Sequence, residues 1–373
     1  MQWKSISKDE TQFIKGISIF LIVMHNYFHW VKPIVGENEF GFNRERIVAF
    51  GQELLAQPLE AVHLLFAYFG HYGVQTFIFL SAYGLYRSYH EREVGWLSFQ
   101  WNRISKLYPA FLLAILVHYL MIVFYEGAVD ATGWYLKFYL FKLSLLSNFV
   151  PDQAFSGNGP WWFFSFIVQF YLVFLLIRDA VKRYGEGVLL GLAGISYAAR
   201  IFLNPYLVDH GLNIFFTVVG FLPELCLGIF LARREQWRIP ALWLWGALLV
   251  SVLGNWYESA WWFSSTAVLI LMLVVLRWYL DRADLGGALN RFFLYLGRIS
   301  LPLFAAHGVL RAPFVASANE AANWGYTFIL GIAFFLVALA VAQLMDWLIA
   351  GLGRVYAEAR QRRLLSNAGA KDA

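Results

Sequence analysis

The segment Lys15–Trp30, "KGISIFLIVMHNYFHW", decides the fold, because so apolar a run predicts a helix that crosses a membrane. At about 100° per residue, the polar side chains Ser18, His25 and His29 fall with Lys15 in a stripe of about 80°. So narrow a polar stripe predicts that this face of the helix is turned toward the interior of a helix bundle. A rise of about 1.5 Å per residue places His25 about 15 Å from Lys15, near the middle of the membrane.

The composition is that of a membrane protein. Of the 373 residues, 60% are hydrophobic and 14% are charged, whereas soluble domains contain about 45–50% apolar and about 25% charged residues. The single cysteine, Cys226, excludes an internal disulfide bond. The net charge of +5 predicts no nucleic-acid partner, because the positions of the basic residues along the chain explain it.

Ten segments of about 20 mostly apolar residues are long enough to cross a bilayer. They predict an all-α integral membrane protein, a bundle of about ten transmembrane helices, over residues 12–33, 62–86, 107–126, 161–178, 187–204, 212–232, 240–256, 260–278, 293–312 and 326–350. An eleventh apolar stretch, Trp134–Phe149, contains two lysines and is interpreted as an interfacial or re-entrant helix.

The distribution of basic residues predicts the orientation. If the N-terminus is cytoplasmic and the ten segments alternate, 22 of the 29 lysines and arginines lie on the cytoplasmic side. Both termini are then cytoplasmic. We expect residues 1–353 to form a single transmembrane domain and residues 354–373 to form a basic cytoplasmic tail against anionic lipid.

Ionisable side chains inside predicted spans are costly and mark functional sites by default. For His25 two interpretations stand: a catalytic proton acceptor, or a structural hydrogen bond to a neighbouring helix. The candidates within the predicted spans are His25, His29, His71, His118, Glu224, His307 and Asp346.

A carboxylate and a basic pair need separate interpretation. Glu224 follows Pro223, which interrupts the backbone ladder, so its carboxyl group must be paired, protonated or hydrated. Arg103 and Lys106 lie near the predicted start of the third segment. They either anchor its cytoplasmic end or bind phosphate at the amide end of the helix.

A metal site is not expected from the sequence. His25 and His29 have i, i+4 spacing, but no carboxylate accompanies them as in the H-E-x-x-H motif. The sequence also contains neither a nucleophile elbow nor a Walker loop.

Five blocks, in this order, make the chain resemble the integral-membrane acyltransferase-3 family, whose members typically acylate surface glycans. The blocks are "KGISIFLIVMH", "GVQTFIFLSAYGLY", "NRISKLYPAF", "WWFFSFIVQFYLVF" and "RISLPLFAAHGVL". Together they cover nearly the whole length. The resemblance implies an acyltransferase of the bacterial inner membrane that uses an acyl-CoA, expected to be acetyl-CoA, as co-substrate and a glycan or lipid-linked saccharide as acceptor. Membrane lipid is a further partner, and a homo-oligomer is left open.

The resemblance also implies roles for particular residues. It assigns catalysis to His25, with Asn26 and Glu224 as further candidates, and the sites for both substrates to residues of the five blocks. The acyl-CoA candidates are Lys15, Ser81, Tyr83, Arg103, Lys106, Tyr108 and Arg298, and the acceptor candidates are Trp162, Ser165, Gln169, Tyr171 and His307.

The chain departs from the family pattern in two places. The family usually has ten residues between its basic residue and its histidine, but nine separate Lys15 from His25, so that Asn26 occupies the usual histidine position. The acidic residue expected before "QFYL" is replaced by Ile167 or Val168. His25 stays on the same half of the helix and keeps the catalytic assignment.

The expected reaction is direct transfer, in which His25 deprotonates a glycan hydroxyl that then attacks the thioester. Ser81, Tyr83 or Asn26 are candidate donors to the oxyanion, and an acyl-histidine intermediate is the second mechanism. The alternative function is a transporter or exporter of a glycan or other small molecule, with Glu224 and buried histidines as a proton relay.

Overall fold

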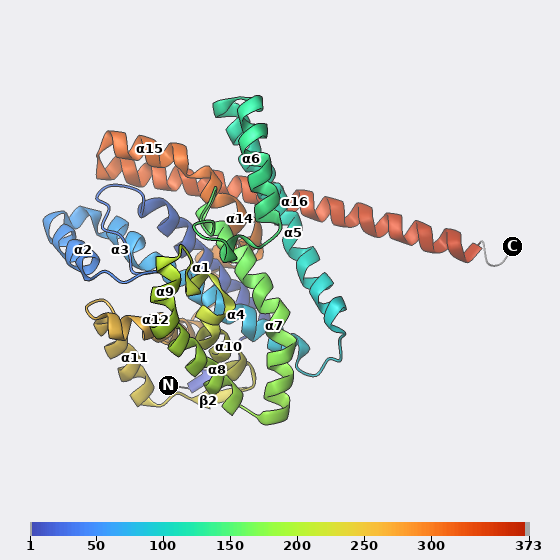
Figure 1. The fold of residues 1–373 in the computed structure, drawn as a ribbon, viewed down its shortest axis with the longest axis horizontal. Helices are drawn as coiled ribbons and strands as arrows, with labels where there is room; N and C mark the ends of the chain where they lie inside the picture. The colour runs from blue at the N-terminus through green and yellow to red at the C-terminus, as the bar shows by residue number, and fades with distance from the viewer. Residues whose placement is uncertain (1, 370–373) are drawn as a thin grey trace.

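The computed structural model describes residues 2–369, and it is almost entirely helical (Figure 1). Two short strands, β1 (Gln2–Lys4) and β2 (Gln236–Arg238), pair antiparallel. The α-helices are α1 (Lys8–Phe28), α2 (Arg44–Ala56), α3 (Ala61–Phe69), α4 (Gly73–Tyr89), α5 (Trp96–Glu126), α6 (Ala128–Leu143), α7 (Trp162–Tyr184), α8 (Gly187–Ala198), α9 (Asn204–Asp209), α10 (Leu222–Ala232), α11 (Ala241–Leu253), α12 (Glu258–Leu280), α13 (Ala288–Arg298), α14 (Ser300–Leu310), α15 (Ala312–Ala321) and α16 (Trp324–Gly369).

Short helical turns link several of these helices. The turns are η1 (Pro58–Glu60), η2 (Gly70–Tyr72), η3 (Ser147–Phe149), η4 (Gly159–Trp161), the π-helical η5 (Ala199–Leu203), η6 (Ile214–Phe216) and η7 (Val218–Phe221).

Helix α1 is the centre of the bundle. Its start is fixed by a capping box: the Glu10 amide donates to the Ser7 hydroxyl, and the Glu10 carboxylate accepts from the Ser7 amide. The helix then packs against α13, α4, α3 and α14. Two of these contacts bring backbones together, because a Cβ added at Gly16 would meet the Phe293 carbonyl and one at Gly73 would meet the Ser18 carbonyl. The polar stripe of α1 therefore faces other helices, as the sequence predicts.

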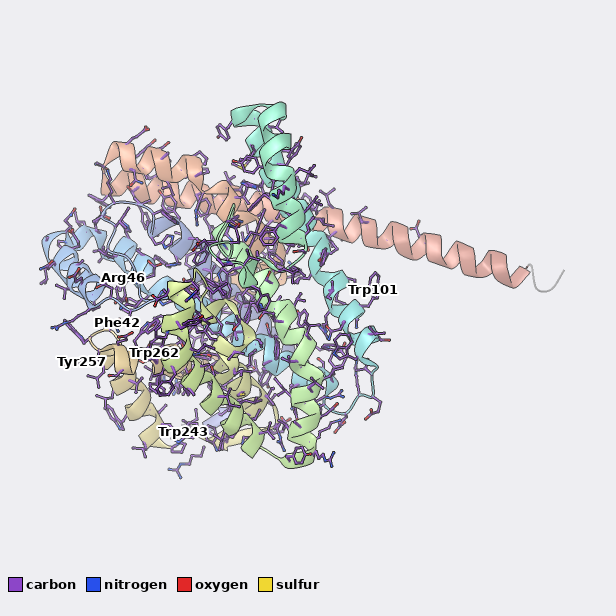
Figure 2. The ribbon with its side chains drawn as sticks, in the orientation of Figure 1. Phe42, Arg46, Trp101, Trp243, Tyr257 and Trp262 are labelled. Carbon is purple, nitrogen blue, oxygen red and sulfur yellow. The ribbon has the colours of Figure 1, made fainter. Side chains whose placement is uncertain are left out.

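The predicted count of about ten spans is not confirmed. Five helices within residues 2–369 are long and apolar enough to cross a membrane, or six if a bent pair forms one span. They are Trp96–Tyr125, Gly159–Tyr184, Gly187–Asp209, Glu258–Leu280 and Trp324–Arg354, and the bent pair is α13 with α14. Helix α1 is not among them, since its polar residues dilute its apolar character. Trp101 of α5 points away from the bundle, as expected of a lipid-facing side chain (Figure 2).

Several predicted segments differ from the helices that form. The segment 62–86 divides into α3, η2 and α4, and the segment 293–312 is bent by 81° between α13 and α14. Pro302, in the first turn of α14, has no amide proton to continue the ladder of α13. Because α5 begins at Trp96 rather than at 107, Arg103 and Lys106 lie two turns inside the helix. The pair therefore does not lie beside the free amides at the start of the helix, whereas phosphate binding by the two cations themselves stays a prediction.

The two ends of the chain differ in their surroundings. Strand β1 lies against β2, and the amide of Ser5 donates to the carbonyl of Glu235 over 2.8 Å. The N-terminus and the loop before α11 are thus on one side of the bundle. Helix α16 instead projects far beyond the other helices (Figure 1). The predicted tail 354–373 continues this helix up to Gly369, and its last four residues lie outside the described part.

Candidate active site

A cavity of about 510 Å³ opens beside the polar stripe of α1. Residues from α1, from the loop between α1 and α2, from η2 and from the loop before α7 surround it. Those used below are His25, Asn26, His29, Trp30, Glu37, Glu39, Phe40, His71, Phe155, Trp162 and Arg311.

His25 is held in one orientation. Its side chain is 3% exposed, and Nδ1 lies 3.1 Å from the carbonyl oxygen of Phe66 on α3. Because a carbonyl can only accept, Nδ1 carries the proton and donates, and Nε2 keeps its lone pair. Gly70 lies directly against the Cβ of His25. The helix break after α3 thus supplies both the carbonyl and the close contact that fix the imidazole.

Two more histidines and a carboxylate adjoin His25. The ring centroid of His29 lies 4.6 Å from that of His25, and the ring of His71 lies 5.6 Å away. Glu37 accepts a hydrogen bond from His29 Nδ1 at 3.3 Å. Burial raises the pKa of Glu37, but the bond from His29 and the charges of His25, His29 and His71 outweigh it and lower the pKa to about 2. Glu37 is therefore a carboxylate at neutral pH.

Arg46 of α2, which is labelled in Figure 2, fixes the loop that carries Glu37 through hydrogen bonds. The Arg46 guanidinium donates to the carbonyls of Glu37 and Gly41 and to Oδ1 of Asn38. Glu39 on the same loop is enclosed, and burial followed by the charge of Glu37 raises its pKa well above the usual value. The cavity therefore receives two carboxyl groups from this loop, and the pKa values of the two groups are shifted in opposite directions.

Arg311, just after α14, supplies a cation on the opposite side. It donates to Oδ1 of Asn26 at 3.0 Å and stacks over the ring of Trp30, 5.1 Å from the centroid. The amide nitrogen of Asn26 donates to the carbonyl of Ile22. The structure thus brings the candidate Asn26 next to His25, with both ends of its side chain engaged.

The residues predicted to bind the glycan acceptor do not all lie at the cavity. Trp162 lines the cavity. Gln169 instead bridges backbone groups, since it donates to the carbonyl of Phe216 and accepts from the amide of Val218. Ser165 and Tyr171 lie on the same helix but do not line this cavity. His307 is fully buried, with Nδ1 on backbone carbonyls and Nε2 without a hydrogen-bond partner in the described part.

The predicted acyl-CoA residues are not brought to this cavity. Tyr83 accepts from the amide of Ile6, Ser81 donates to the carbonyl of Phe77, and Tyr108 donates to the carbonyl of Leu143. All three hydroxyl groups form hydrogen bonds with the backbone, and these bonds stabilise the fold.

The basic members of the same set are less constrained. The Arg103 guanidinium lies over the ring of Tyr89, 4.8 Å from the centroid, and Lys106 is exposed. Lys15 and Arg298 lie on the packed helices α1 and α13. Of Lys15, Arg103 and Lys106, only Lys106 has an exposed side chain, so its charge is accessible to a ligand.

Glu224 lies in a different buried cluster, in which both of its carboxylate oxygens have hydrogen-bond partners. Its carboxylate forms a buried ion pair with Arg200 at 2.9 Å and accepts from the hydroxyls of Ser265 and Thr266. Both charged side chains have no exposed surface. The structure therefore does not bring Glu224 together with His25.

The sequence prediction missed Glu37, Glu39 and Arg311 as site residues. The two glutamates lie in "VGENEFGF", where acidic residues after a helix ordinarily face solvent. Only the return of this loop across the end of α1 places them in the cavity. His71 carried a usable signal, because it is an ionisable residue within an apolar segment.

Comparison with known families identifies the family of the chain. The model of the Acyl_transf_3 family, described as an acyltransferase domain, matches residues 10–344. No curated protein and no solved structure matches the chain. The matched region runs from the first turn of α1 into α16 and contains every residue of the cavity, and the predicted resemblance is thereby confirmed. The chain belongs to the acyltransferase-3 family and is a multi-pass membrane acyltransferase.

Proposed function

We propose that this protein transfers an acyl group, expected to be acetyl, from cytoplasmic acyl-CoA to a hydroxyl of an extracytoplasmic or lipid-linked glycan, in the inner membrane of a bacterium. His25 is the general base. The observation that carries the proposal is the hydrogen bond from His25 Nδ1 to the Phe66 carbonyl, because it fixes the tautomer whose Nε2 can accept a proton at the cavity.

The reaction follows from this tautomer. Nε2 takes the proton of the acceptor hydroxyl as its oxygen attacks the thioester carbonyl, and a tetrahedral oxyanion forms. When the oxyanion collapses, the bond to sulfur breaks and the CoA thiolate takes the proton back from His25. Arg311 is the charged donor at the cavity and is suited to stabilise the oxyanion.

The walls of the cavity support a sugar as acceptor. Phe40, Phe155 and Trp162 form an aromatic cluster, with the ring of Phe40 5.4 Å from each of the other two. Glu37 and Glu39 lie on the same loop as Phe40 and offer carboxyl oxygens as acceptors for hydroxyl groups. A flat apolar surface beside convergent polar groups is a common arrangement for a ligand that has both kinds of surface.

The donor is assigned to the basic end of the bundle. Lys15, Arg103, Lys106 and Arg298 offer positive charge for the phosphates of CoA. The acyl thioester has to reach His25 from that end, along α1. The rival proton relay has less support, since the carboxylate of Glu224 is already paired with Arg200.

The test is the conservative variant His25→Gln, with glycan O-acetyl content measured in cells and acyl transfer measured with purified protein. We expect loss of at least about 100-fold in rate, the contribution typical of a general base. His210→Gln is the matched control, because His210 is exposed and does not line the cavity. Wild-type acylation by His25→Gln would refute the proposal.

A further inference from the structure

The cavity contains three side chains that could hold a metal ion. One ligand atom from each of His25, His29 and Glu37 can be chosen so that all three lie within 4.8 Å of one another. The sequence indicated only His25 and His29, because no carboxylate accompanies them in α1. The structure supplies the third from the loop, eight residues after His29.

The donor atoms are in the state that a metal ion requires. His25 donates from Nδ1 to the Phe66 carbonyl, so Nε2 has a free lone pair. Metal-binding histidines commonly use one nitrogen for the ion and the other for such a hydrogen bond. Nε2 of His29 is buried and has no hydrogen-bond partner among the described residues. The hydrogen bond from His29 Nδ1 holds the Glu37 carboxylate beside the imidazoles.

We propose that His25, His29 and Glu37 form a binding site for a divalent transition-metal ion of the Zn²⁺ type. Two imidazoles with one carboxylate are a donor set typical of Zn²⁺ sites with an open fourth position. Contraction of the ligand atoms toward bonds of about 2 Å needs a side-chain adjustment. Glu37 can make this adjustment because it lies on a loop, whereas His25 is fixed by α3.

The proposal has a consequence that rests on the proposed function. His25 has one free lone pair, at Nε2, and the same lone pair cannot bind a metal ion and accept a proton. Zn²⁺ at this site therefore inhibits acyl transfer, and its removal by a chelator restores the rate. The nearby cation Arg311, bonded to Asn26, opposes binding, whereas the charge of Glu37 favours it.

The binding experiment is titration of purified, metal-free, full-length protein in detergent with Co²⁺, followed by displacement with Zn²⁺. We expect one equivalent of Co²⁺ to give visible d–d absorption bands, which Zn²⁺ abolishes. His29→Gln and Glu37→Gln should each weaken binding by more than about tenfold, at least the loss seen for residues that only support a metal ligand. His210→Gln changes an exposed side chain and Glu53→Gln a half-buried one, and neither residue lines the cavity, so both variants should bind as the wild type does.

Size-exclusion chromatography and thermal melting identify any variant that fails to fold, and Glu37→Gln keeps the shape of the side chain. Absence of a one-equivalent site, or equal affinity in both ligand variants and the wild type, would overturn the metal site. Binding without inhibition of transfer would leave the metal site standing and would instead refute His25 as the base.

Discussion

Gly70 packs on His25 so closely that a methyl group added to Gly70 would lie 2.7 Å from the Cβ of His25 and 3.0 Å from the Leu21 carbonyl. The second contact is with backbone, which cannot move out of the way as a flexible side chain can. Residue 70 therefore sets the distance between η2 and α1, and with it the position of the imidazole.

Gly70→Ala should displace α1 from η2. Overpacking of this kind typically costs about 1–3 kcal/mol, and the shift of His25 should lower the rate of acyl transfer by about tenfold or more. Melting temperature and transfer rate are the measurements. Gly84→Ala is the matched control, because a Cβ there meets nothing within 4 Å. Equal melting temperatures and equal transfer rates for Gly70→Ala and Gly84→Ala would contradict the role of Gly70 in positioning His25.

Glu37 should make stability depend on acid pH. Its pKa in the folded protein is about 2, below the ordinary value of 4.5. A lowered pKa stabilises the fold fully above about pH 5, and the contribution is lost as the pH falls toward 2. Melting temperatures between pH 7 and pH 3 should therefore fall more steeply for the wild type than for Glu37→Gln. If melting temperature fell equally with pH in both proteins, the pKa of Glu37 would not be lowered by the fold.

The central part of the fold could be predicted from sequence because it follows from periodicity. The polar stripe of α1 indicated a face toward the bundle, and Ser18 and His25 are buried there. The number of spans could not be predicted in the same way. Hydropathy averages over a window, so it does not detect the division at Gly70 or the 81° bend before Pro302.

The candidate site was predictable only in part, for a related reason. His25 lies in an apolar segment and is therefore conspicuous, whereas Glu37 lies in a polar loop and is not. Its role depends on where Arg46 holds the loop, and no hydrophobic periodicity encodes these side-chain hydrogen bonds. Glu224 shows the converse, because it is conspicuous in an apolar segment, yet its charge is paired with the fully buried Arg200 away from the cavity.

Arg103→Ala combined with Lys106→Ala tests the assignment of the donor site. Loss of two cations should raise KM for acetyl-CoA by about tenfold or more and should leave KM for the acceptor unchanged, since charged contacts to phosphate contribute about 1.5–3 kcal/mol each. Steady-state kinetics against each substrate separates the two effects. Arg282→Ala, which removes an exposed cation stacked on Trp278, is the control. An equal change in both KM values would argue against a CoA site at this pair.

Glu224→Gln distinguishes a structural carboxylate from a proton relay. Removal of its charge leaves Arg200 buried without an ionic partner, and breaking a buried pair costs about 3–5 kcal/mol. We expect a clear fall in melting temperature, with normal transfer by the protein that remains folded. Glu235→Gln is the control, because the side chain of Glu235 is 69% exposed. A relay predicts the opposite result, an unchanged melting temperature with lost activity, because the protonated carboxyl and the amide have the same shape but only the carboxyl can release a proton.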